Sequence, residues 1–330
     1  MRKKIRFGVI GTSRIAKKAA IPAIIASQSA ELSMVGSRSP EHAQGFAEQF
    51  GCAHGSYEDV LKSDVDAVYI SLPNSMHEEW AVKAAEAGKH VWCEKPATLT
   101  YESAERMVDA AQKNNVRLME GFMFLYHPQH TKVLEIIRSG TLGDITGFEG
   151  RFAYPIPEAG NNRLKPELGG GIYNDAAVYP IRASRFVFNE EPEGVVCDLT
   201  IDPTYGVDVE ARITLTYPGG RTASISSAFD TDYRSTYRVL GTKADLSMER
   251  AYAVPSDMAV KIFIERSETR EEILIEPADH FRLMVDDFCN EITSGSRTKD
   301  YEGDLLSQAK ILDAGRISND EKRVVRLSEL

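Results

Sequence analysis

Residues 1–120 alternate between short apolar runs and amphipathic stretches, and this alternation restricts the possible folds more than any other feature of the chain. The apolar runs are short, rich in branched residues and without clean polar alternation, which is typical of strands buried on both faces. Such strands alternating with helices predict a parallel, doubly wound sheet. The predicted strands are Ile5–Ile10, Glu31–Val35, Ala67–Leu72, His90–Cys93 and Val116–Met119.

Three stretches between these runs carry signals for helix ends. The stretch 39–51 opens with a serine N-cap and a proline in the first turn, and it closes on a glycine. The stretch 76–88 also ends at a glycine, and 100–114 begins with a threonine N-cap and an acidic first turn. We therefore predict a helix in each stretch.

Beyond about residue 145 the pattern becomes that of an antiparallel sheet. Glu210–Tyr217 and Thr222–Phe229 alternate between apolar and polar residues, and the Pro-Gly-Gly between them predicts a hairpin turn. One face of this sheet is rich in small hydroxyl side chains. Such a flat face favours contact with a second copy of the chain, although an ordinary solvated face is the alternative. Further strands are predicted at Arg238–Leu240 and Val260–Ile264, and further helices at 280–293 and 302–318.

The change in pattern divides the chain into two parts. Residues 1–122 are expected to bind a dinucleotide, and residues 123–330 are expected to bind substrate and to form oligomers. No linker rich in proline or serine separates the parts. We expect a C-terminal helix near 303–319 to pack back on the first domain.

The first strand runs into the sequence Gly-Thr-Ser-Arg-Ile-Ala, the position of a dinucleotide-binding loop. In such loops the first glycine permits a tight turn, the second admits the pyrophosphate, and the third position must be small. Here Ser13 replaces the second glycine and offers an N–H and a hydroxyl. A strand-to-helix turn without ligand would look similar, but the place at the start of a βαβ unit favours nucleotide binding. The predicted contacts are Gly11, Thr12, Ser13, Arg14 and Ile15.

The end of the second strand bears on the choice of cofactor. An enzyme that uses NAD places an acid there for the ribose 2′-hydroxyl. This strand ends instead in Ser37-Arg38-Ser39. Because a guanidinium binds phosphate through bidentate, charge-assisted hydrogen bonds, Ser37 and Arg38 favour NADP(H) over NAD(H). The alternative is that Arg38 is a solvated charge beside a helix cap.

The sequence Val-Trp-Cys-Glu-Lys-Pro places Lys95 at the carboxyl end of a predicted strand. Ligands of open α/β sheets bind beyond such ends, so this lysine can donate to a substrate oxygen during hydride transfer. A surface lysine at a strand end is the plainer interpretation of that tripeptide alone. The other cofactor contacts predicted near this edge are Leu72, Asn74, His77 and Glu94.

Several motifs together resemble the Gfo/Idh/MocA oxidoreductases, the family of glucose-fructose oxidoreductase and inositol dehydrogenase. They are GVIGTSRIA, NSMHEEWAVKAAEAGKHVWCEKP, GFMFLYHPQ and GGGIYNDAAVYP, and the resemblance covers essentially the whole chain. It implies a Rossmann domain, an α/β domain with a large open, predominantly antiparallel sheet, a nicotinamide cofactor and a sugar or cyclitol substrate.

The resemblance also implies which residues are catalytic. The lysine of the EKP motif corresponds to Lys95, and an aspartate followed four residues later by histidine corresponds to Asp175 and Tyr179. Tyrosine at the last position resembles the branch with sugar ketoreductases and aldose or diol dehydrogenases. The family often has an arginine where this chain has Leu125, which weakens any inference about a substrate contact there.

The chemistry of these residues is consistent without the resemblance. Residues four apart on a helix share a face, so Asp175 and Tyr179 can point into one pocket. An adjacent ammonium lowers the pKa of a phenol, so Lys95 can tune Tyr179. The sequence leaves open which of the two is the immediate proton donor. Candidate substrate contacts are Arg163, Tyr154 and Tyr126, and no histidine spacing indicates a metal.

Composition narrows the possible partners. The net charge of −10 argues against nucleic acid and anionic membranes, which require clustered basic surface. The four cysteines are scattered without CxxC spacing, which indicates a reducing compartment. No segment approaches the ~20 apolar residues of a membrane span. We expect a cytoplasmic protein that forms a homodimer or homotetramer through the open sheet face.

The expected activity is that of an NADP(H)-dependent oxidoreductase that interconverts a secondary alcohol and a ketone on a sugar or nucleotide-linked sugar. A free aldose or trans-dihydrodiol dehydrogenase would share every motif. A dinucleotide-binding regulator without catalysis is a further alternative. The retention of Lys95, Asp175 and Tyr179 together argues against it.

Overall fold

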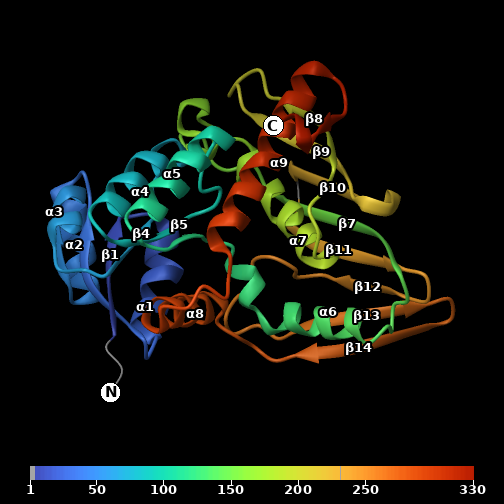
Figure 1. The fold of residues 1–330 in the computed structure, drawn as a ribbon, viewed down its shortest axis with the longest axis horizontal. Coiled ribbons are helices and arrows are strands. Elements are labelled where there is room, and N and C mark those ends of the chain that lie inside the picture. The colour runs from blue at the N-terminus through green and yellow to red at the C-terminus, as the bar shows by residue number, and fades with distance from the viewer. Residues whose placement is uncertain (1–3, 231) are drawn as a thin grey trace. The chain divides into compact units, whose positions relative to one another are not determined.

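The computed structural model describes residues 4–230 and 232–330, and the chain forms two compact units (Figure 1). The first unit comprises the residues up to Met123 together with His280–Ala309, and the second comprises Phe124–Asp279 and Lys310–Leu330. The helix α9 (Tyr301–Glu321) begins in the first unit and ends in the second. The division predicted after residue 122 did not include the return of His280–Ala309 to the first unit. The roles expected of the two parts stay predictions.

The first unit is built on six parallel strands in the order β3-β2-β1-β4-β5-β6, as expected for a Rossmann fold. The prediction of a doubly wound parallel sheet is therefore confirmed. The short strand β3 was not predicted, because its sequence Ala-His-Gly has no apolar run. The strands are β1 (Ile5–Ile10), β2 (Ala30–Gly36), β3 (Ala53–Gly55), β4 (Ala67–Ile70), β5 (His90–Cys93) and β6 (Leu118–Glu120).

Five of these strands end at one level of the sheet. Gly36 of β2 pairs with Ile10 of β1, and Ile10 pairs with Ile70 of β4. Ile70 pairs in turn with Cys93 of β5, and Cys93 pairs with Glu120 of β6. The loops that follow these strands therefore leave the sheet at the same edge, which is where ligands of open α/β sheets bind.

Helices connect and cover the parallel strands. Two N-caps expected from the sequence are present: the Ser39 hydroxyl accepts from the His42 N–H, and that of Thr100 accepts from the Ser103 N–H. Helices α4 and α5 pack against each other, and α1 packs against α8 (Figure 1). The helices are α1 (Ile21–Ala26), α2 (Pro40–Phe50), α3 (Tyr57–Lys62), α4 (His77–Glu86), α5 (Tyr101–Lys113) and α8 (His280–Ser294).

A buried ion-pair network accounts for the return of the chain to the first unit. Arg117, directly before β6, pairs with Glu291 of α8 at 2.9 Å and with Glu302 of α9 at 3.0 Å. The side chains of all three residues are less than a tenth exposed. Loss of one partner would leave a buried charge uncompensated, which typically costs several kcal/mol, so the network ties both helices to the sheet edge.

The second unit contains a nine-stranded sheet in the order β14-β13-β12-β11-β7-β10-β9-β8-β15. Its pairs are antiparallel except for β7 with β10, which confirms the predicted, predominantly antiparallel sheet. Helix α7 (Val178–Phe188) packs against β7, and α6 (Pro128–Arg138) packs against β13. The strands are β7 (Ile145–Tyr154), β8 (Gly194–Ile201), β9 (Asp208–Thr216), β10 (Thr222–Phe229), β11 (Arg234–Gly241), β12 (Asp245–Met248), β13 (Val260–Arg266), β14 (Thr269–Ile275) and β15 (Val325–Arg326).

The predicted alternation along β9 is also observed. Ala211, Ile213 and Leu215 are buried, whereas the side chain of Arg212 is 63% exposed. Within the described residues, no helix combines the length and the apolar character that crossing a membrane requires.

His90, the first residue of β5, gives the first unit a titratable group that is sensitive to acid. Its Nδ1 accepts from the Arg117 N–H at 2.9 Å. Burial, and then the positive charge of Arg117, lower the pKa of His90 to about 4. The neutral ring is therefore the form compatible with the folded state.

We expect His90→Gln to remove part of the acid sensitivity of folding. Unfolded His90 takes up a proton near its ordinary pKa of 6.5, whereas folded His90 does so only near 4, so the free energy of unfolding falls as the pH drops between these values. The contribution amounts to roughly 3 kcal/mol at the acid end. Urea denaturation between pH 7 and 4 measures it: the stability of the wild type relative to the variant should decline over this range. A constant difference would contradict the assignment.

Candidate active site

The loop after β1 is fastened to the ends of both neighbouring strands. The Gly11 N–H donates to the Gly36 carbonyl at 3.0 Å, and the Ser71 hydroxyl donates to the Gly11 carbonyl at 3.3 Å. Gly11 has a φ of +105°, and a Cβ there would lie 3.0 Å from the Leu72 side chain. Glycine is therefore required by both backbone and space, as in the tight turn of a dinucleotide loop.

Ser13, which stands at the second glycine position, starts the following helix. Its hydroxyl accepts from the Ala16 N–H at 3.1 Å, so the serine caps the helix whose N-terminus would face a pyrophosphate. The Thr12 hydroxyl lies 3.3 Å from that of Ser37, which joins this loop to the end of β2. Arg14 and Ile15 are exposed beside it.

A hollow of about 550 Å³ lies beyond the end of β2. Arg38 lines it and is the one guanidinium among the residues found there. Two wall carboxylates are already engaged: Asp59 accepts from the capping residue Ser56, and Glu79 pairs with Lys83. The other lining residues include Ser37, His54, Tyr57, Met76 and Trp80.

The loop after β5 that carries Lys95 is anchored on both sides of that residue. The Tyr69 hydroxyl donates to the Glu94 carboxylate at 2.8 Å. On the other side, the Ala97 N–H donates to the Glu120 carboxylate at 2.9 Å. Lys95 is partly buried between these two anchors, which come from β4 and β6.

His77, the first residue of α4, contacts the same loop. Its Nδ1 lies 2.9 Å from the Pro96 carbonyl and its Nε2 lies 2.9 Å from the Leu72 carbonyl. The side chain has no exposed surface, and burial, together with the Lys95 charge, lowers its pKa. This geometry favours a role in holding two loops over the direct cofactor contact expected from the sequence. Asn74 lies between Leu72 and α4 in the chain, in a 3₁₀ turn (Asn74–Met76), and is partly exposed.

In the second unit, Asp175 is held by two donors. Its Oδ2 accepts from the Tyr154 hydroxyl and, at 2.6 Å, from the Arg163 Nε. Burial, and then the charge of Asp175, raise the pKa of Tyr154 well above its usual value, and the pKa of Arg163 is raised chiefly by Asp175. Two of the three residues expected to contact substrate, Tyr154 and Arg163, therefore contact the carboxylate.

Tyr179 lies on the same side of β7 as this carboxylate. It is 6% exposed, and its ring packs on Phe152, with ring centroids 5.2 Å apart. Phe152 and Tyr154 are two residues apart on β7, so they share a side of the strand. Asp175 and Tyr179 therefore approach the same side, across a π-helical turn (Tyr173–Ala177) that leads into α7.

The triple glycine before this turn packs against the loop that carries Arg163. The Gly171 N–H donates to the Arg163 carbonyl at 2.8 Å, and a Cβ on Gly170 would lie 2.6 Å from that oxygen. A Cβ on Gly171 would lie 2.2 Å from the Asp208 carboxylate. Glycine is therefore needed at both positions, because the Arg163 carbonyl and the Asp208 carboxylate occupy the space that a Cβ would take.

Asp208 of β9 and Arg316 of α9 were not found from the sequence. The Asp208 carboxylate accepts from the Tyr173 N–H at 2.5 Å, and Arg316 donates to the Asn174 side chain at 2.7 Å. Burial raises the pKa of Asp208. Both residues fix the start of the turn that bears Asp175, but they lie far from it in sequence and no local motif marks them. Tyr126, the third expected substrate contact, ends the 3₁₀ turn Met123–Tyr126 and is partly buried.

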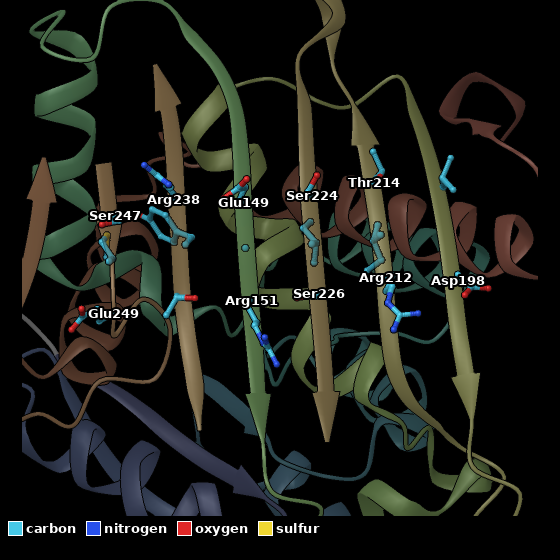
Figure 2. A pocket seen from close by; sticks show the side chains of 17 residues that line it. Glu149, Arg151, Asp198, Arg212, Thr214, Ser224, Ser226, Arg238, Ser247 and Glu249 are labelled. Atoms are coloured by element: carbon cyan, nitrogen blue, oxygen red, sulfur yellow. The ribbon is translucent and has the colours of Figure 1, made fainter. Parts of the chain in front are cut away.

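The outer face of the large sheet forms a second polar surface (Figure 2). Small hydroxyl side chains line it from β9, β10 and β12, including Thr214, Ser224, Ser226 and Ser247. Three carboxylates and three guanidiniums accompany them, so the lining carries no net charge: Glu149, Asp198, Glu249, Arg151, Arg212 and Arg238. In the described part of the chain, no cluster of three or more His, Cys, Asp or Glu side chains is arranged to hold a metal ion.

The strand order, the glycine turn beside the β1–β4 reversal and the lysine at the neighbouring strand end define a dinucleotide-dependent oxidoreductase. The chain belongs to the GFO/IDH/MocA family. Residues 5–122 match its oxidoreductase domain with an NAD-binding Rossmann fold, and residues 130–247 match its C-terminal domain. The inferred resemblance is confirmed, and the chain is an NAD(P)-dependent oxidoreductase that acts on CH–OH groups.

Relatives with known activities cover nearly the whole chain. A dTDP-3,4-didehydro-2,6-dideoxy-alpha-D-glucose 3-reductase from Actinomadura kijaniata is 35% identical, over 94% of this chain and 95% of the relative. An NADP-dependent D-xylose 1-dehydrogenase from Haloferax volcanii is 32% identical, over 93% and 95%. The crystal structure of a 3-ketoreductase from Actinomadura kijaniata with NADP and TDP-benzene superposes with a TM-score of 0.92 and 34% identity, over 96% and 98%.

Proposed function

We propose that the protein is an NADP(H)-dependent oxidoreductase that interconverts a ketone and a secondary alcohol on a sugar, with nucleotide-linked sugars as the first substrates to test. The observation that carries this proposal is the anchored loop that holds Lys95 at the end of β5, at the same edge of the sheet as the glycine turn after β1. The 3-reductase and ketoreductase relatives support the nucleotide-linked class. The xylose dehydrogenase relative keeps free aldoses as the alternative.

In this reaction the protein stabilises the charge on the substrate oxygen and transfers a proton to it. The bound dinucleotide would supply or accept the hydride. The carbonyl oxygen of the substrate gains negative charge as the hydride reaches its carbon, and the Lys95 ammonium stabilises that charge. The Tyr179 hydroxyl then delivers the proton that completes the alcohol, and the reverse reaction returns it. We assign the immediate proton transfer to Tyr179.

Asp175 acts in this site as a carboxylate anion that orients the substrate. Two donors converge on its carboxylate, which favours the ionised form, so we assign it the binding of a substrate hydroxyl. Tyr154 and Arg163 then act on the substrate through Asp175. Gly11, Thr12, Ser13, Arg14 and Ile15 would hold the pyrophosphate, and Ser37 and Arg38 the ribose 2′-phosphate.

Lys95→Met and Tyr179→Phe test the chemistry. Each should lower kcat by about 10²- to 10⁴-fold, because each removes a group that acts on the developing alkoxide. Loss of NADPH absorbance measures turnover with a panel of nucleotide-linked keto sugars and, in the reverse direction, free pentoses and hexoses. NADPH binding, followed by fluorescence, should change little.

Lys113→Met is the matched control, because Lys113 is 77% exposed on α5. It should retain wild-type turnover. Undiminished kcat in Lys95→Met would contradict the assigned chemistry. Turnover confined to free aldoses would move the protein to the alternative substrate class.

Arg38→Ala tests the preference for NADP(H). The variant should raise the dissociation constant of NADPH at least 10-fold, because a charge-assisted contact to the 2′-phosphate is lost. The dissociation constant of NADH should stay within about 2-fold. Lys18→Ala removes an equal charge from an exposed position and should affect neither nucleotide. Equal weakening of both nucleotides by Arg38→Ala would refute the assignment.

We also propose that the outer face of the large sheet binds a second copy of the chain. The whole chain carries a net charge of −10, so two copies repel on average, whereas this face has balanced charges and small side chains. A two-fold axis through such a face can bring its carboxylates opposite its guanidiniums. A homodimer is the simplest assembly, and a homotetramer requires a further surface.

Ser226→Arg tests the interface. A bulky cation on the hydroxyl-rich face should clash with its copy across the axis and yield monomers, as measured by light scattering. Gln44→Arg adds the same charge on α2, where Gln44 is exposed, and should leave the assembly intact. An unchanged mass in the Ser226→Arg variant would place the contact elsewhere.

A further inference from the structure

His77 poses an electrostatic problem. Both of its ring nitrogens lie 2.9 Å from carbonyl oxygens, and the side chain has no exposed surface. A neutral imidazole has one N–H, so it can donate to only one of the two oxygens. Burial and the nearby Lys95 ammonium disfavour a second proton. One contact is therefore a hydrogen bond, and the other lacks a donor.

The two carbonyls belong to the two loops on which the active site depends. Leu72 follows β4, and its side chain lies against the Gly11 turn. Pro96 follows Lys95 directly in the loop after β5. The ring thus bridges the loops at the ends of adjacent parallel strands. Tyr69 anchors the second loop at Glu94, and Glu120 accepts from the N–H of the same peptide group whose carbonyl faces His77.

We propose that His77 is a positioning residue for Lys95 and that it acts by donating from Nδ1 to the Pro96 carbonyl. This inference rests on the catalytic role proposed for Lys95. The bond holds the Pro96–Ala97 peptide, one residue beyond the lysine, so it limits where the Lys95 backbone can lie. Because misplacing a reacting group by about 1 Å can cost on the order of 10²-fold in rate, such a bond affects kcat without any contact between His77 and substrate.

Two amide substitutions separate the two ring nitrogens. The Nδ2 of asparagine can occupy the position of Nδ1 and donate to Pro96, whereas the longer glutamine places its Nε2 near the position of imidazole Nε2 and donates to Leu72. Both remove the ring and leave a similar gap. They differ in which loop keeps its bond.

We expect His77→Asn to keep kcat within about 3-fold of the wild type and His77→Gln to lose about 10- to 100-fold. The KM for NADPH should change less than 3-fold in both, because the glycine turn is intact. His90→Gln is the matched control, since His90 lies at the opposite end of β5 and also bonds to backbone. It should lower the melting temperature without lowering kcat. Equal kcat in the two His77 variants, or a loss expressed only in the KM for NADPH, would overturn the proposal.

Crystal structures of the two variants test the positioning without any substrate. Pro96 and Lys95 should keep their places in His77→Asn and shift in His77→Gln. Identical places in both would overturn the role of His77, even if turnover were observed. Absence of turnover by the wild type on the whole sugar panel would instead overturn the proposed function, and the crystallographic comparison would still decide the role of His77.

Discussion

The first unit depends on one constraint, which is that its parallel strands end at the same level of the sheet. Ile10, Ile70 and Cys93 lie in one register line, so the loops that follow them leave the sheet together. Each loop then hydrogen-bonds to a neighbour, as Gly11 does to Gly36 and Ser71 does to Gly11. A one-residue slip of a strand would move its loop away from these partners and reverse the faces of its side chains.

A feature of this fold was predictable where its signal lies within a few consecutive residues. The strands β1 and β5 were predicted with their observed bounds, because each is a short, mostly apolar run that stops at residues unfavourable for a strand. The caps at Ser39 and Thr100 were also predicted, because a cap is decided within four residues. The strand β3 was missed because its place follows from pairing with β2 and its own sequence carries no signal.

The site was predictable in its residue types and less so in its contacts. A lysine at a strand end and an aspartate in a glycine-rich motif are visible in the sequence. That Tyr154 and Arg163 would turn toward Asp175 depends on how β7 and the 160s loop pack, which no local pattern encodes. Asp208 and Arg316 reach the same turn from 35 and 142 residues away, so only the folded chain brings them together.

The pKa values of two tyrosines in the second unit bear on which phenol could donate the proton. Burial raises the pKa of Tyr252 well above its usual value, and burial together with the Asp175 charge does the same for Tyr154. A phenol whose pKa is raised in this way keeps its proton near neutral pH, so neither tyrosine releases one readily. Tyr179 packs between Phe152 and Tyr252 in the same aromatic cluster. The assignment of the proton to Tyr179 with Lys95 therefore stays a proposal, and it requires that the ammonium favour the phenolate form.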